Sequence, residues 1–120
     1  MFEAVFAARD AALAAVRPGV RASEIDRAAR DVLASAGFGA QFTHPTGHGV
    51  GFAAIDPNAR PRIHPASDDP LEEGMVFNIE PAVYIEGDCG LRHCDVVALT
   101  ADGPEVLTPF QATVGELIIP

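Results

Sequence analysis

Residues 75–107 read MVFNIEPAVYIEGDCGLRHCDVVALTADGPEVL, and we expect this segment to form most of the sheet. Gly87-Asp88 and Asp102-Gly103 are turn signals in it, and Asp-Gly is a strong hairpin marker because glycine accepts a positive φ. Strands joined by tight turns pair antiparallel, so we expect a mainly antiparallel sheet. The apolar runs between the turns predict strands over residues 75–79, 82–85, 91–99 and 105–107.

Residues 1 to about 37 have the apolar spacing of two helices. The first stripe covers residues 2–16, and Pro18-Gly19 ends it. The second stripe covers residues 25–36, with apolar side chains three and four positions apart. We expect a helical hairpin packed on the sheet, which makes residues 1–120 one α+β domain.

The second helix has recognisable end signals. Ser23 is the expected N-cap, and Asp26, three residues later, completes an approximate capping box. Gly37 is the expected stop, because glycine adopts the left-handed cap without steric cost.

Composition excludes several classes of partner. Seventeen acidic and eight basic residues give a formal net charge of −9, which argues against nucleic acid or an anionic membrane surface. No apolar run approaches the roughly 18–20 residues that cross a bilayer. Charged residues interrupt the N-terminal apolar stretch, so a secretory signal is not expected. Two cysteines are too few for a disulfide scaffold, and we expect a cytoplasmic location.

The segment His44-Pro-Thr-Gly-His48-Gly-Val-Gly51 is the most informative for chemistry. Glycine lets the backbone approach neighbouring groups closely, and an imidazole on such a loop can act as a ligand or a base. The alternative is a glycine-rich turn whose histidines hydrogen-bond to the backbone. The segment alone does not separate these interpretations.

Glu80 follows a buried apolar run, so its carboxylate needs a partner. A metal ion and an ion pair with Arg92 are equally consistent with the sequence. On a strand, Arg92 and Cys94 share one face, while His93 and Asp95 share the other. Cys94 is either a soft metal ligand or a small buried apolar group. The acidic cluster Asp68, Asp69, Glu72 and Glu73 is expected to be solvated. Arg60 and Arg62 are expected to form ion pairs elsewhere on the surface or with this cluster.

Taken together, these segments resemble the C-terminal half of the pita-bread metallopeptidases, in the branch of Xaa-Pro aminopeptidases and Xaa-Pro dipeptidases. The resemblance implies half of a pita-bread fold with a curved sheet. It extends over nearly the whole chain and rests on Arg17-Pro-Gly19, Thr46-Gly-His-Gly-Val-Gly51, Arg62-Ile63, residues 70–81, Tyr84, Gly90-Leu-Arg92 and residues 102–108.

The resemblance also implies site residues. The family binds two metal ions through two Asp, one His and two Glu, and the ions activate a water for attack on the peptide carbonyl. His48 matches the histidine ligand and Glu80 the first glutamate. Cys94 stands where the second, bridging glutamate is found. His44 matches an earlier catalytic histidine. Ile55 stands where the family has an outer histidine, and the acidic residue that follows that histidine is shortened here to Asp56.

These departures shape the expected function. The two aspartates belong to a hairpin before the first helix, so the chain itself is expected to hold no dimetal pair and to lack peptidase activity in isolation. Self-association as a homodimer, or pairing with a complementing N-terminal half, is expected, and a peptide is a candidate ligand. The alternative is an active enzyme, either completed by a partner or using one zinc or manganese ion bound by His48, Glu80 and Cys94.

Overall fold

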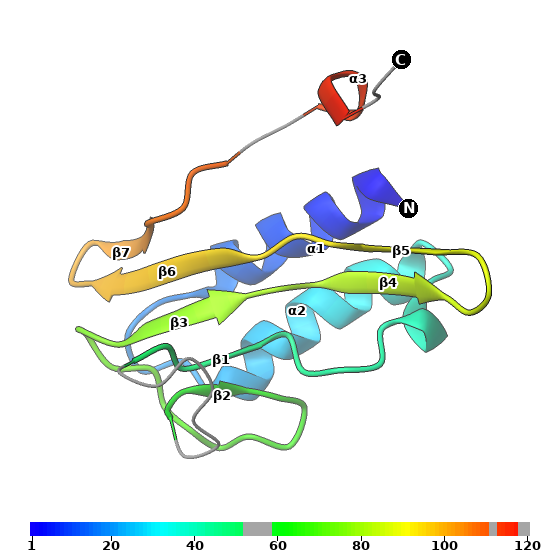
Figure 1. Ribbon diagram of the computed structural model, residues 1–120. Coiled ribbons are helices and arrows are strands. Elements are labelled where there is room, and N and C mark those ends of the chain that lie inside the picture. The colour runs from blue at the N-terminus through cyan, green and yellow to red at the C-terminus, as the bar shows by residue number, and fades with distance from the viewer. Residues whose placement is uncertain (52–58, 111–112, 118–120) are drawn as a thin grey trace.

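The structure is a computed structural model, and it describes residues 1–51, 59–110 and 113–117. Helices α1 (Phe2–Ala15) and α2 (Ala22–Ser35) form the predicted hairpin. Every pairing between the described strands is antiparallel. Both helices lie on the same side of the strands (Figure 1). The α+β prediction is therefore confirmed.

The strands group into three antiparallel sheets. The largest sheet has β6 (Asp95–Thr100) between β3 (Val76–Ile79) and β7 (Gly103–Val106). The other two pairs are β4 (Ala82–Ile85) with β5 (Cys89–Arg92), and β1 (Gly47–His48) with β2 (Arg62–Ile63). A short 3-10 helix η1 (Gly39–Gln41) and α3 (Val114–Leu117) complete the described elements.

The predicted strand over residues 91–99 is split at His93 and Cys94, which is a correction to the sequence prediction. Pro81 separates β3 from β4 on the opposite side and has no N–H for the ladder. The His93 N–H donates instead to the Pro81 carbonyl at 3.2 Å. The register is the same on both sides of the split, so Glu80 lies opposite Cys94.

The ends of α2 show one wrong and one correct prediction. The N-cap is Arg21 rather than Ser23, and no side chain caps the helix. The Ala22 N–H donates to the carbonyl of Asp69 at 2.9 Å, so a distant segment supplies the missing acceptor. At the other end Gly37 has a φ of +84°, as the predicted left-handed stop requires.

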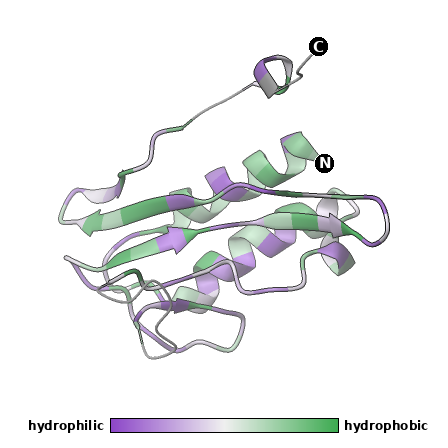
Figure 2. Cartoon of the chain, in the orientation of Figure 1, coloured by the Kyte–Doolittle hydropathy of each residue, from purple (hydrophilic) through white to green (hydrophobic). Residues whose placement is uncertain are grey.

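The core lies between the helices and the strands. Figure 2 shows α1 as mostly hydrophobic, whereas α2 alternates between hydrophobic and hydrophilic residues. No helix in the described part of the chain is long and apolar enough to cross a membrane. The fully buried side chains from both layers include Val5, Ala8, Ala12, Ile25, Ala29, Leu33, Phe77, Ile79 and Val97.

Candidate functional site

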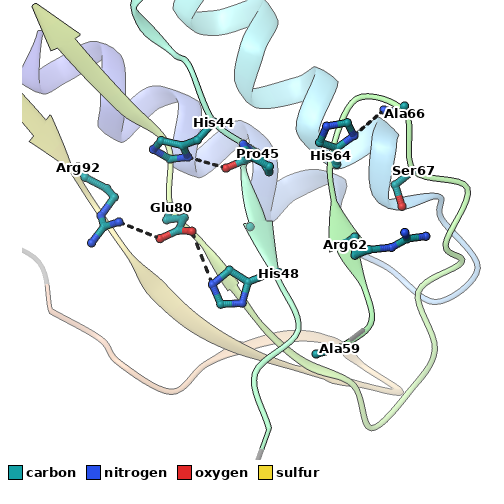
Figure 3. A pocket seen from close by; sticks show the side chains of 11 residues that line it. His44, Pro45, His48, Ala59, Arg62, His64, Ala66, Ser67, Glu80 and Arg92 are labelled. Atoms are coloured by element: carbon teal, nitrogen blue, oxygen red, sulfur yellow. Dashed lines mark hydrogen bonds and ion pairs between the residues drawn. The ribbon is translucent and has the colours of Figure 1, made fainter. Parts of the chain in front are cut away.

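A cavity of about 480 Å³ opens between β1, the β3–β4 junction, the end of β5 and the segment over residues 59–67. His44, His48, Glu80 and Arg92 lie on one side of it, with Arg62, His64 and Ser67 on the other (Figure 3). The structure therefore brings three of the four predicted site residues to one cavity. Cys94 is not among the residues that line it.

His48 is held by the backbone around it. Its Nδ1 lies 2.9 Å from the carbonyl oxygen of Gly49, and its Nε2 lies 3.8 Å from Oε1 of Glu80 (Figure 3). The His48 N–H donates to Oδ1 of Asn78 at 2.7 Å. The ring is thus anchored at one nitrogen and faces the Glu80 carboxylate with the other.

Glu80 sits just beyond the end of β3, and 13% of its side chain is exposed. Its N–H donates to the Thr46 carbonyl at 2.7 Å, which ties the strand end to the histidine loop. Its Oε2 lies 3.4 Å from Nη1 of Arg92. The ion pair that the sequence allowed as an alternative to a metal ion is therefore present.

His44 stands at the mouth of the same cavity. Its Nδ1 contacts the Pro45 carbonyl oxygen at 2.7 Å, and its Nε2 contacts the Tyr84 hydroxyl at 3.1 Å. Because a carbonyl oxygen can only accept, Nδ1 carries the proton, and Nε2 accepts from the tyrosine hydroxyl. Both ring nitrogens are thereby engaged by the chain itself.

The histidine loop is fixed to α2 by Asp26, which is fully buried. Its Oδ1 accepts from the N–H and the hydroxyl of Thr46 at 3.0 and 2.9 Å, and its Oδ2 accepts from Nε of Arg30 at 2.6 Å. Arg30 also donates to the carbonyls of Phe42 and His44 at 3.0 and 2.7 Å. Asp26 thus acts as a tertiary anchor rather than as part of a capping box.

Cys94 lies on the Glu80 side of its strand, as the predicted alternation requires. Its Sγ is 3.9 Å from Nδ2 of Asn78. Cys94 is exposed, so it is not the small buried group that the sequence allowed. Partial desolvation of the thiol, and then the charge of Glu80, still raise the pKa of Cys94 above its ordinary value. Both factors favour an uncharged thiol near neutral pH.

His93 and Asp95 point the other way, toward α1. Asp95 is fully buried and accepts from Nε of Arg9 at 2.5 Å, while Nε2 of His93 lies 3.2 Å from its Oδ1. The Arg9 pKa is raised: burial lowers it, and the hydrogen bond to Asp95 more than offsets that together with the other contacts. This cluster joins α1 to β6 and faces away from the cavity.

The sequence predicts that the acidic cluster is solvated, and the structure shows that this is wrong for one of its members. Asp69 is only 4% exposed and accepts from the N–H and Nε of Arg62, both at 3.0 Å. Hydrogen bonding from Arg62 lowers the Asp69 pKa to about 2. The expected pairing with Arg60 and Arg62 is observed, and it fixes the cavity wall that carries His64.

The side chains around His48 determine whether this site can hold a metal ion. In the described residues, no three His, Cys, Asp or Glu side chains come together as a metal-binding group. His48 and Glu80 are close, but the amide of Asn78 lies 3.2 Å from Nε2 of His48, and Arg92 faces the carboxylate. In this arrangement the side chains do not fit a bound ion. Ile55 and Asp56 lie outside the described residues.

Sequence reasoning missed Asn78. Its signal was an amide inside the apolar run Met75-Val-Phe-Asn-Ile79, where a polar side chain needs a partner.

The sequence is similar to those of known metallopeptidases and related proteins. The sequence model of metallopeptidase family M24 matches residues 1–101. The Xaa-Pro dipeptidase of Lactobacillus delbrueckii subsp. lactis is 42% identical over 117 residues, which cover 98% of this chain and 30% of that protein. The agropine synthesis cyclase of Rhizobium rhizogenes is 46% identical over 103 residues, which cover 86% of this chain and 25% of that protein.

The fold has a counterpart among solved structures. Dipeptidase PepE from Mycobacterium ulcerans superposes with a TM-score of 0.86 at 42% identity, covering 92% of this chain and 29% of that one. The chain spans about 25–30% of the length of the curated relatives it matches.

Proposed function

Because this chain belongs to metallopeptidase family M24, we propose that it carries the His48–Glu80 side of an Xaa-Pro dipeptidase-like site and does not hydrolyse peptides by itself. The observation that supports it is the set of possible ligands: His48 and Glu80 approach within 3.8 Å. A thiol, that of Cys94, stands where the family resemblance implies a carboxylate. Manganese and cobalt sites of this type rest on hard oxygen ligands, and a thiol does not replace a bridging carboxylate.

Similarity to the family does not by itself imply peptide hydrolysis. One relative at 46% identity carries the name of a cyclase, so a similar segment occurs in a protein named for another reaction. The substrate class is proposed from the dipeptidase matches, with an Xaa-Pro peptide as the candidate ligand of the cavity.

The proposal includes a partner, either a second copy of the chain or a complementing first half. The chain matches less than a third of the length of its curated relatives. It also presents an apolar groove lined in part by Phe2, Phe6, Leu91 and Phe110, in which Phe110 is 66% exposed. Exposed apolar surface of this kind favours association.

An assay of the purified chain on an Xaa-Pro dipeptide, with manganese, cobalt or zinc added in turn, tests the activity. We expect turnover equal to that of the metal-only blank. Turnover that His48→Ala abolishes would refute the proposal. Activity that returns only when a first-half polypeptide is added would support the complementing partner, and a monomer in sedimentation at micromolar concentration would contradict self-association.

A second candidate is a single-ion site of His48, Glu80 and Cys94, with zinc or manganese as the ion. It is favoured by the register, which sets Cys94 opposite Glu80. An imidazole, a carboxylate and a thiolate suit zinc. Stoichiometric zinc in protein purified without added metal, lost in Cys94→Ser, would favour it over the first proposal.

A cytoplasmic location also belongs to the proposal and is consistent with free Cys89 and Cys94.

A further inference from the structure

The side chain of Asn78 contacts two of the predicted site residues, His48 and Cys94. It lies on β3, is 6% exposed, and sits between β1, which carries His48, and the segment that leads into β6 and carries Cys94. Among the residues that the structure describes, it makes three polar contacts, all with His48 and Cys94. The proposed function gives it no role.

A single backbone group determines how the Asn78 amide is oriented. The N–H of His48 can only donate, and it reaches the amide at 2.7 Å, so the atom it meets is the oxygen Oδ1. The amide nitrogen therefore points the opposite way. Nδ2 lies 3.2 Å from Nε2 of His48 and 3.9 Å from Sγ of Cys94, and both of these atoms can accept.

The amide orientation in turn determines the tautomer of His48. Because Nδ2 donates, Nε2 must offer a lone pair, and the ring proton must be on Nδ1. Nδ1 lies 2.9 Å from the Gly49 carbonyl oxygen, which is a matching acceptor. The two ends of the ring thus require the same tautomer independently.

We propose that Asn78 is a positioning residue that fixes His48 as the Nδ1–H tautomer and holds its Nε2 lone pair in a hydrogen bond. The inference rests on the proposed function only in taking His48 as the functional histidine. An ion that binds Nε2 must first displace the Asn78 amide. This accounts for the mismatch between the donor set and a bound ion, although the tautomer itself suits a ligand that binds through Nε2.

The backbone around Asn78 leaves this side chain little freedom. A Cβ built on Gly47 would lie 1.9 Å from the carbonyl oxygen of Asn78, so the two backbones are in direct contact. On the other side, Asn78 is paired with Val96 in the β3–β6 ladder. With the backbone fixed on both sides, the amide is held where it meets the imidazole.

Long-range ¹H–¹⁵N spectra of the full 120-residue chain, without added metal, test the proposal. His48→Gln identifies the His48 signals by their loss. We expect wild-type Nδ1 to appear as a protonated nitrogen and Nε2 as an unprotonated one. In Asn78→Asp an oxygen faces Nε2 while another oxygen still accepts from the His48 N–H, so we expect the Nε2 signal to move into the protonated range.

Thr46→Val is the matched control, since it removes a buried hydroxyl contact with Asp26 near His48 but touches no ring nitrogen. We expect its His48 signals to keep the wild-type pattern. A wild-type Nε2–H form overturns the inference without any variant having to fold, and so does an Asn78→Asp spectrum unchanged at His48. Peptidase turnover by the wild-type chain would refute the proposed function and leave the tautomer result standing.

Discussion

Replacing Asp26 with asparagine should destabilise the chain through the anchor between α2 and the histidine loop. Asp26 is fully buried, and its two oxygens accept four hydrogen bonds from Arg30 and Thr46. The substitution keeps the size of the side chain. It removes the negative charge, however, and places the NH2 group of the asparagine amide next to the Arg30 guanidinium. Both groups can only donate, so no hydrogen bond forms between them.

Breaking a buried ion pair by removing one partner costs roughly 3–5 kcal/mol. The side chain of Arg30 is 29% exposed, so solvent stabilises part of its unpaired charge. We therefore expect Asp26→Asn to lower the free energy of unfolding by about 3 kcal/mol, a large share of the roughly 5–15 kcal/mol typical of a domain. Urea unfolding with an unchanged m value measures it.

Asp31→Asn is the control, because it makes the same chemical change on the same helix at an exposed position. Surface changes of this kind stay within about 0.5 kcal/mol. Faster amide exchange at Thr46 in Asp26→Asn alone would locate the loss in the loop. If the two variants unfold within about 1 kcal/mol of each other, Asp26 is not the anchor described here.

Three further predictions concern the surroundings of the site. The Asp69 pKa is lowered to about 2 in the folded chain, so the Asp69 carboxylate should stabilise the fold fully above about pH 4 and lose this effect as the pH falls toward 2. In thermal unfolding from pH 5 down to pH 2, the melting temperature should therefore fall more steeply in wild type than in Asp69→Asn. Gly47→Ala should cost at least about 3 kcal/mol, since its Cβ would overlap backbone atoms. Gly51→Ala, whose Cβ would meet none of the described residues within 4 Å, should be nearly neutral in the same urea assay. Asp95→Asn should cost about 3 kcal/mol by removing the buried partner of Arg9 and leaving it only the exposed carboxylate of Asp10, and a melting temperature equal to wild type would contradict that role.

Local sequence signals located most of the elements because their causes are local. Gly87 and Gly103 take positive φ at the two hairpin turns, and Gly37 does so at the end of α2. Alternation along residues 92–95 also placed Arg92 and Cys94 apart from His93 and Asp95. Period-two geometry persists through the split strand because the register does not change there.

The errors arose where distant segments satisfy a local need. Ser23 is the better cap by type, yet α2 begins at Ala22, because the carbonyl of Asp69 accepts its N–H. Gly19 and Leu71 are joined by a further backbone hydrogen bond of 2.8 Å, so residues 69–71 hold the turn between the helices. The sequence pattern within residues 17–26 does not predict these contacts with residues 69–71.

The site was partly predictable for the same reason. His48 and Glu80 were identified from their motifs, and the turn at Gly87 could have placed Glu80 opposite Cys94, since the register is centred there. Asn78 required more, because its role depends on how two loops and a strand meet. An amide in an apolar strand indicates only that partners exist, not which groups they are.

The charges around Glu80 explain why cysteine is compatible with position 94. Arg92 lies 3.4 Å from the Glu80 carboxylate and offsets its charge. A thiol is mostly uncharged at neutral pH, and the Glu80 charge helps to raise the pKa of Cys94 further, so Cys94 adds no charge that Arg92 would have to balance. A carboxylate at this position, which the family resemblance implies for relatives, would stand opposite Glu80 in the same register and repel it unless further cations were bound. With a thiol at position 94, Arg92 alone can balance the charge of Glu80.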